Sequence, residues 1–245
     1  MSEEHPLSRL MSTQVSLLLI KEIKEGVFAA AERLPPEVEL SEQLGVSRTV
    51  IRDALSNIER EGYIERTRGV GTVINHRIVN LETRLDLKQE YNELVVNSCY
   101  PSNTDSVQLR LETASEELAE KLNIAPGAKI IACEKRVLAG KNPVIYSFDY
   151  LPMSLFKEVN YETIDWSRSI FDILKDYCGI RVTSDITKVT ATNADAYIRS
   201  KLNVQAGEAL NLLDEISFEK PNQPVLRSLE FYTDFFDFSM LRQRF

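Results

Sequence analysis

The chain has 245 residues, of which 43% are apolar and 27% are charged, a composition typical of a soluble globular protein with two domains. Its apolar runs fall short of the roughly 20 residues of a membrane span, and its acidic start is unlike a signal peptide, so we expect a cytoplasmic protein with no membrane partner. The net charge of −8 excludes a uniformly basic protein, yet residues 46–77 hold six arginines against four acidic residues. Such a local basic patch is what a nucleic-acid surface requires.

The first segment carries the pattern of three helices. Apolar residues spaced four apart along 14–23 predict an amphipathic helix that Gly26 ends. Two prolines before Glu37 predict the start of a second helix, which Gly45 closes. Ser47 caps a third helix, in which Arg48 and Arg52 share one face. The opposite face of that helix is apolar and is formed by Ile51, Ala54, Leu55 and Ile58.

A hairpin is predicted directly after these helices. Residues 63–66 and 72–74 have strand character and flank the glycine-rich tip 67–71, which contains Arg68. Two short helices joined by a glycine-containing turn form a helix-turn-helix, and a basic hairpin that follows the second of them is a wing. We therefore predict a winged helix-turn-helix domain over residues 1–77.

Residues 10–77 resemble the DNA-binding domain of the GntR family of bacterial regulators. The resemblance rests on an ordered run of matches, Leu34-Pro35-x-Glu37-x2-Leu40-x4-Gly45-Val46-Ser47-Arg48-Thr49-x-Ile51-Arg52-x-Ala54-Leu55, then Gly62-Tyr63-Ile64 and Gly69-Val70-Gly71-Thr72. It implies that the third helix enters the major groove of double-stranded DNA and that the wing contacts the backbone or minor groove. The expected DNA-binding residues are Ser47, Arg48, Thr49, Arg52, Arg68, Gly69, Gly71 and Thr72. The alternative is an ordinary helix face on which Arg48 and Arg52 pair with Asp53 and Glu59.

Four departures from the family pattern affect the expected operator sequence more than DNA binding itself, and one of them is Ala30-Ala31 in place of a Pro-Gly turn. Pro36 replaces a serine that would cap the second helix, and Val38 stands where some members have an arginine. Val50 replaces a threonine on the expected groove-facing side of the third helix.

The rest of the chain contains an internal repeat. Residues 78–90 are polar and read as a connection between domains. Beyond them, Ala114-x3-Leu118-x2-Lys121-Leu122-Asn123 returns 80 residues later as Ala194-x3-Ile198-x2-Lys201-Leu202-Asn203, and an Asn/Pro turn with its following strand also recurs. Each copy predicts a helix, a glycine turn and two strands, so we expect an antiparallel sheet with helices on one side.

Roughly residues 85–245 resemble the ligand-binding UTRA domain of the HutC-type branch of the same family, and we assign 91–245 to that domain. The resemblance rests on the order of the Ala-x3-Leu helix, the Asn-Pro-Val turn and the Ser169-Ile170-Phe171 helix start. It implies an α+β fold like that of chorismate lyase, a homodimer on a palindromic operator, and a small-molecule effector that changes DNA affinity. Repression relieved by the effector is the commoner arrangement, although the sequence leaves the direction of control open.

The effector is expected between the two repeats, beside their second strands. The candidate residues are Lys135, Arg136, Ser147, Asp149, Tyr150, Arg168, Ser169, Arg227, Glu230 and Tyr232. The alternative is that alternate polar residues of these strands face water, with Ser169 acting as an ordinary helix cap. Sugar-phosphate-sensing members carry an Arg-x-Arg pair on the strand before the Pro turn, and one of these two arginine positions is Val137 here. A phosphorylated sugar is therefore not favoured over other metabolites.

The sequence argues against two other function classes. An enzyme needs a nucleophile, a base and an orienting group, but the only histidines, His5 and His76, lie outside the effector domain. Three widely separated cysteines form neither a disulfide framework nor a zinc spacing. We therefore expect no catalytic residues, no metal and no cofactor. A winged helix used only for protein contacts would leave Arg48, Arg52 and Arg68 without a role.

Overall fold

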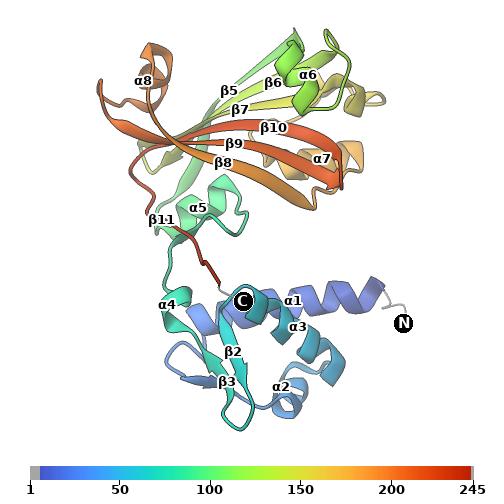
Figure 1. The fold of residues 1–245 in the computed structure, drawn as a ribbon, viewed down its shortest axis with the longest axis vertical. Coiled ribbons are helices and arrows are strands. Elements are labelled where there is room, and N and C mark those ends of the chain that lie inside the picture. Colours follow the sequence, from blue (N-terminus) through green and yellow to red (C-terminus); the bar gives the residue numbers. More distant parts are fainter. Residues whose placement is uncertain (1–5, 244–245) are drawn as a thin grey trace. The chain divides into compact units, whose positions relative to one another are not determined.

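The computed structural model describes residues 6–243, with side chains from residue 11 onward. The chain forms two compact units, whose elements are labelled in Figure 1. Of the described residues, 6–84 and 239–243 form the N-terminal unit and 85–238 form the C-terminal unit. These limits differ from the expected ones because Leu241 packs against Gly62, which has no side chain to obstruct it, so the last residues group with the N-terminal unit.

The predicted connection over residues 78–90 also differs from what the structure shows, because part of it is regular structure. Its start continues the helix α4 (His76–Val79) and includes the strand β4 (Thr83–Arg84), which pairs with β11 (Phe238–Ser239). Its end, from Lys88 to Glu90, lines a cavity of the C-terminal unit.

The N-terminal unit is the predicted winged helix-turn-helix. Its further elements are α1 (Pro6–Lys24), β1 (Arg33–Leu34), α2 (Glu37–Leu44), α3 (Arg48–Arg60), β2 (Ile64–Thr67) and β3 (Gly71–Ile74). Gly45 ends α2 in the left-handed conformation, with φ at 64°, as a helix-closing glycine does. The Ser47 hydroxyl accepts a hydrogen bond from the Val50 amide at 3.3 Å and so caps α3.

The core of this unit lies between α1 and α3. The apolar face of α3 is fully buried, as its spacing predicts, and it packs beside Leu19 and Ile23 of α1. Burial of each such side chain contributes roughly 1.5–3 kcal/mol. Val50 is buried as well, so the expectation that it faces a DNA groove is wrong: its side chain falls on the core side of the first turn.

The C-terminal unit is built on one six-stranded antiparallel sheet. Its strands are β5 (Ser102–Thr113), β6 (Lys129–Ala139), β7 (Asn142–Pro152), β8 (Ser184–Asn193), β9 (Ala209–Lys220) and β10 (Gln223–Tyr232), in the order β5-β6-β7-β10-β9-β8. Its helices are α5 (Tyr91–Asn97), α6 (Glu116–Lys121), α7 (Ile170–Cys178) and α8 (Ala196–Leu202), with the short 3-10 helices η1 (Met153–Phe156) and η2 (Tyr161–Thr163).

The internal repeat is visible in this strand order. The first copy contributes β5, α6, β6 and β7, the second contributes β8, α8, β9 and β10, and the copies meet where β7 pairs with β10. Each copy therefore begins with a strand that the helix-strand-strand prediction lacked. The recurrent Leu-Asn ends the helices because Asn123 and Asn203 adopt left-handed backbone angles, with φ at 50° and 56°.

Helices cover both faces of the sheet, not one. The repeat helices α6 and α8 pack on the face that carries Ile130, Tyr146 and Leu210. The opposite face, which we call the inner face, is covered by α5 and α7. Figure 1 shows α6 and α8 above the sheet and α5 below it. The helices α5 and α7 come from segments outside the repeat, so the repeat alone could not predict them.

Candidate DNA-binding surface and candidate effector site

The exposed side of α3 presents the predicted DNA-contacting residues together. Ser47, Arg48, Thr49 and Arg52 are exposed at its first turns. Arg48 and Arg52 lie one turn apart on the same face. Within the described residues, their guanidinium groups have no ion pair or hydrogen bond. This leaves five N–H donors on each side chain available to an external acceptor.

The alternative role for these arginines, pairing within the helix face, is not realised. Glu59, one of the two proposed acidic partners, instead binds Arg66, whose Nε donates to Glu59 Oε2 at 2.7 Å. The Arg66 amide also donates to Glu59 at 2.9 Å, and these contacts with Arg66 lower the pKa of Glu59 although burial opposes the shift. Arg66 is thus a structural arginine, whereas Arg48 and Arg52 are not used inside the fold.

The wing tip is exposed and is shaped by its glycines. β2 and β3 pair from Ile64 opposite Ile74 to Thr67 opposite Gly71. Gly69 and Gly71 have φ values of 82° and 102°, which other residues rarely adopt. Arg68 is exposed between the strands and Thr72 is half-buried. Arg33 of β1 donates to the carbonyl of Val70 at 2.9 Å and braces the tip, a role that the sequence pattern did not indicate.

Three predicted effector residues, Ser147, Asp149 and Glu230, meet Ser228 on the inner face of the sheet in the C-terminal unit. The register places Ser228 opposite Asp149 and Glu230 opposite Ser147. The Ser228 hydroxyl donates to Asp149 Oδ1 at 2.6 Å. All four side chains are buried, with Ser147 and Asp149 at 0% exposure, so the alternative that these strand positions face water is wrong.

Glu230 is the centre of a buried hydrogen-bond network. The Tyr232 hydroxyl donates to Glu230 Oε2 at 2.6 Å and the Tyr91 hydroxyl donates to Oε1 at 2.8 Å. Lys88 Nζ lies 3.5 Å from the same Oε1 and also forms an ion pair with Glu215. Burial raises the pKa of Glu230 to about 7, and the neighbouring Glu215 carboxylate raises it too, while Lys88 acts in the opposite direction.

Sequence reasoning missed three members of this network: Lys88, Tyr91 and Glu215. The signal for Glu215 was present, because the repeat offset of 80 residues relates it to Lys135, which was predicted. Lys88 was assigned to the connecting segment, and Tyr91 to the start of the domain. Only the fold brings these two beside β9 and β10.

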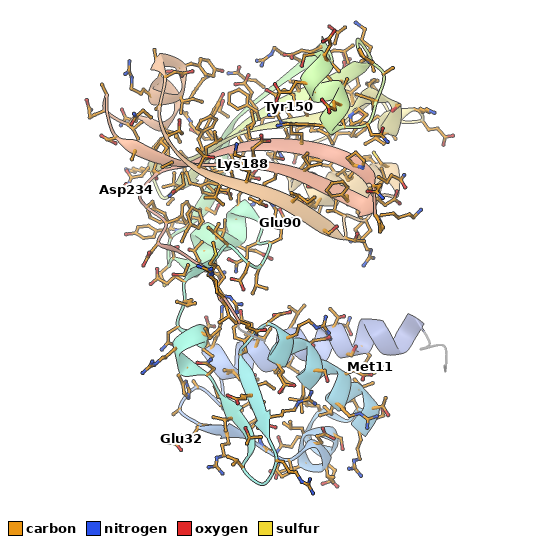
Figure 2. The ribbon with its side chains drawn as sticks, in the orientation of Figure 1. Met11, Glu32, Glu90, Tyr150, Lys188 and Asp234 are labelled. Atoms are coloured by element: carbon orange, nitrogen blue, oxygen red, sulfur yellow. The ribbon has the colours of Figure 1, made fainter. Side chains whose placement is uncertain are left out.

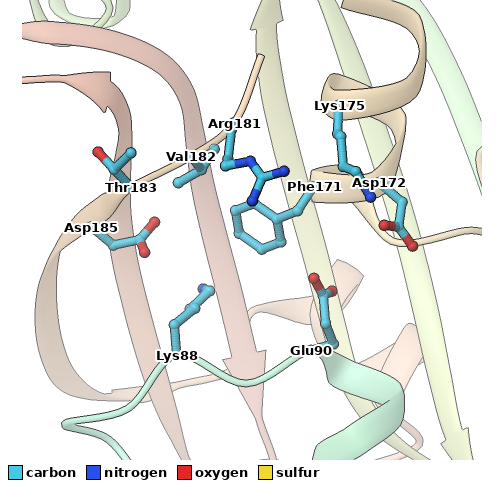
Figure 3. A pocket seen from close by; sticks show the side chains of 9 residues that line it. All are labelled: Lys88, Glu90, Phe171, Asp172, Lys175, Arg181, Val182, Thr183 and Asp185. Carbon is cyan, nitrogen blue, oxygen red and sulfur yellow. The ribbon is translucent and has the colours of Figure 1, made fainter. Parts of the chain in front are cut away.

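Two neighbouring cavities lie against the inner face. The larger has a volume of about 320 Å³ and is lined by Lys88, Glu90, Phe171, Asp172, Lys175, Arg181, Val182, Thr183 and Asp185 (Figure 3). The smaller, of about 20 Å³, shares three of these residues with the larger and is also lined by three predicted residues, Lys135, Arg168 and Ser169. The Lys135 ammonium is buried there and donates to the Arg168 carbonyl at 2.7 Å.

Ser169 and Arg168 have structural partners at this cavity. The Ser169 hydroxyl accepts from the amides of Phe171 and Asp172 at 3.1 and 3.4 Å, so it is the N-cap of α7, which is the alternative role considered for it. The Arg168 guanidinium pairs with Asp176 at 2.6 Å.

The remaining predicted residues, Arg136, Tyr150 and Arg227, lie on the other face of the sheet. Arg136 pairs with Asp105 at 2.7 Å, and Arg227 Nε donates to Asp214 at 3.0 Å. Tyr150 packs against the cluster around α6, and Figure 2 shows it beside that helix, away from Glu90. Each of the three follows or precedes an inner-face residue by one position, and side chains alternate along a strand. They therefore lie on the opposite face from Ser147, Asp149 and Glu230 and line neither of the two cavities.

Neither a membrane-spanning helix nor a metal-ligand cluster occurs among the described residues. Among residues 6–243, no helix combines the length and apolarity needed to cross a membrane. Within the same range, no group of three or more His, Cys, Asp or Glu side chains is arranged to hold a metal ion. His5 lies outside the described residues, and the His76 ring bonds to the Ala31 carbonyl at 2.9 Å in the N-terminal unit.

Comparison with known proteins agrees with both units. Residues 11–74 match the bacterial regulatory proteins of the gntR family, and residues 100–234 match the UTRA domain. The HTH-type transcriptional regulator YurK of Bacillus subtilis is 26% identical over 216 residues, covering 88% of each chain. The HTH-type transcriptional repressor NagR of the same species is 27% identical over 208 residues, 84% of this chain and 83% of its own.

Solved structures share the fold. The possible transcriptional regulator YydK of Bacillus subtilis superposes with a TM-score of 0.73 at 20% identity, over 95% of this chain and 99% of its own. PhnF of Mycobacterium smegmatis superposes with a TM-score of 0.61 at 23% identity, over 87% and 93% of the two chains. With a winged helix-turn-helix and an antiparallel sheet domain that match both halves of this architecture, the chain belongs to the gntR family of bacterial regulatory proteins and is a transcriptional regulator with a C-terminal UTRA domain.

Proposed function

We propose that this regulator binds a specific operator through α3 and the wing, and that a small molecule in the inner-face cavity of the UTRA domain changes its operator affinity. The observation that carries the DNA surface is the exposure of Arg48, Arg52 and Arg68 without partners among the described residues. Unused guanidinium groups at a helix start suit guanine edges and phosphates. The free amides at the start of α3 support phosphate binding at the same place.

A selection from random duplex DNA at moderate salt tests this surface, with the wild type and the double variant Arg48→Ala/Arg52→Ala. Each lost base contact weakens binding by roughly 1–3 kcal/mol, and each lost phosphate contact lowers the salt slope by about 0.9. The matched control is Arg60→Ala, since Arg60 is exposed on the same helix but bonds to Asn57 at 3.0 Å. Equal enrichment by the double variant would refute the assigned recognition helix.

We further propose that the protein is a cytoplasmic homodimeric repressor of a palindromic operator, released by its effector. NagR and the probable fructoselysine utilization operon repressor of Shigella flexneri, which is 25% identical over 217 residues, are both named as repressors. Two-fold symmetry of the protein would be mirrored in the operator. Light scattering of the purified protein measures the dimer, and a palindrome in the selected DNA is expected. A monomer that binds a single half-site would contradict this part.

An enzymatic role fits the inner face poorly. Cys133, which lies on it beside Asp149 in the strand register, is the thiol nearest the network. Burial raises the pKa of Cys133 to about 12, so the thiolate needed for nucleophilic attack is not formed at neutral pH. The related proteins named above are regulators, which agrees with a binding role for this face.

A further inference from the structure

The inner face of the sheet carries three buried acidic side chains and, among the described residues, one buried lysine, Lys135. Asp149, Glu215 and Glu230 lie in two adjacent rows of the sheet, and all three are buried. Burial raises the pKa of Asp149, which shows the cost of placing a carboxylate there. Lys135 is the lysine that the sheet itself supplies to the group: it is buried in β6 and donates to the Arg168 carbonyl. Lys88 is the second cation.

Lys88, unlike Lys135, does not belong to a strand of the sheet. It belongs to the irregular segment between β4 and α5, and its side chain is still 31% exposed. Its ammonium enters the larger cavity and pairs with Glu215 and Glu230. Figure 3 shows Lys88 and Asp185 directed into the same space beside Phe171. The Lys88 ammonium, carried by an irregular segment outside the sheet, therefore lies against two carboxyl groups of the sheet.

Two buried atoms beside this position lack partners. Asp149 Oδ2 and Ser147 Oγ have no hydrogen-bond partner among the described residues. The charges that act on Asp149 are those of Lys135, Lys88 and Glu215, so it belongs to the same group. Buried polar atoms are normally paired, and an unpaired carboxylate oxygen next to a cation position can accept from a ligand N–H or O–H.

We propose that the effector is an amine-bearing molecule whose ammonium group replaces that of Lys88 in its ion pairs with Glu215 and Glu230, on the face that also carries Asp149. This inference rests on the proposed effector role of the cavity and specifies its ligand class. A phosphate at the same place would face three carboxylates. The exposed cations Lys175 and Arg181 line the outer part of the cavity, so an acidic group of the effector would be held there and not at the sheet.

The position of Lys88 in the chain links this exchange to regulation. Lys88 follows Arg84, the last residue of the N-terminal unit before the UTRA domain, by four positions. Its ion pairs fix the segment that enters the domain. When an external ammonium takes its place, the segment from Leu85 to Glu90 loses these ion pairs, and the chain that leads from the DNA-binding unit is released.

Chemical rescue tests the exchange in the full-length protein without DNA. In Lys88→Ala the carboxylates lose their internal ammonium, so we expect a melting temperature about 3 °C or more below wild type. n-Butylammonium chloride should then raise it saturably by a similar amount, and far more than it raises that of wild type. n-Butanol and tetramethylammonium chloride are the controls for the alkyl chain and the salt. Lys88→Met is the second variant if Lys88→Ala does not fold.

The matched control variant is Lys188→Ala, an exposed lysine of β8 on the other face of the sheet, which should show no rescue. Equal shifts in wild type and Lys88→Ala, or equal effects of n-butylammonium and tetramethylammonium, would overturn the proposal. A response to magnesium chloride in place of n-butylammonium would identify a metal-ion site and would also overturn it. Because no DNA is present, failure here leaves the proposed operator surface untouched, and failure of the DNA selection leaves the ammonium site untouched.

Discussion

Glu230→Gln tests whether the buried network carries the charge balance described above. Glu230 is buried among two tyrosine hydroxyls, Lys88 and Glu215, and its pKa is raised from 4.5 to about 7. The folded state therefore keeps the proton to a higher pH than the unfolded state does. Stability is lost as pH rises from 4.5 to about 7 and then levels off. The raised pKa corresponds to roughly 3 kcal/mol over that range. Glutamine cannot ionise, so the variant should lack this loss.

The protein contains its own probe for this measurement. Trp166 is the sole tryptophan, is buried against Phe156 in the UTRA domain, and donates to the Tyr161 carbonyl at 2.8 Å. Urea unfolding followed by its fluorescence reports on that domain from pH 4.5 to 8. We expect the stability of the variant, relative to wild type, to rise by roughly 3 kcal/mol across this range. The exposed Glu162→Gln should show no such trend.

Two outcomes would refute the reasoning. A difference between Glu230→Gln and wild type that stays constant with pH would mean that the charge on Glu230 is not opposed by its surroundings. A difference of the opposite sign would mean that Lys88 and the tyrosine hydroxyls outweigh burial and lower the pKa of this carboxyl group.

Two further substitutions test separate parts of the structure. Ser228→Ala removes the hydroxyl that donates to Asp149 at 2.6 Å and leaves a buried carboxylate unpartnered. It should therefore destabilise the UTRA domain by about 1–3 kcal/mol in the same Trp166 assay. An unchanged urea midpoint would show that Asp149 is solvated or protonated. Gly71→Ala places a side chain at a φ of 102° where no atom lies within 4 Å, so the cost is backbone strain of roughly 1–2 kcal/mol in the N-terminal unit. The melting temperature measured by circular dichroism should fall and operator binding should weaken. An unchanged melting temperature and an unchanged operator affinity would contradict the strained geometry.

The N-terminal unit could be predicted almost entirely from the sequence, because its structure is set by local signals. The spacing of the apolar residues of α3, the cap at Ser47 and the left-handed turn at Gly45 act within a few residues of one another. The arginines of the DNA surface are identified by the same spacing. The pairing of Arg66 with Glu59 and the brace from Arg33 to the wing join residues that only the folded hairpin brings together.

The UTRA domain could be predicted in part. The repeat indicated two pairs of strands, and period-two alternation placed Ser147 with Asp149 and Ser228 with Glu230. The same alternation places Arg136, Tyr150 and Arg227 on the opposite face of the sheet from that group. The strands β5 and β8 have few buried residues because they form the two edges of the sheet, so their apolar signal is weak.

What the sequence determined by itself was therefore the family, the recognition helix and the alternation of the central strands, since each depends on residues close in the chain. The tertiary structure alone decided the chemistry of the candidate effector site. Strand register joins Asp149 to Ser228 across 79 positions, and the entry segment brings Lys88 to Glu215 across 127. No short-range pattern encodes such pairs, because their energy arises only when burial removes the water that would otherwise solvate each charge alone.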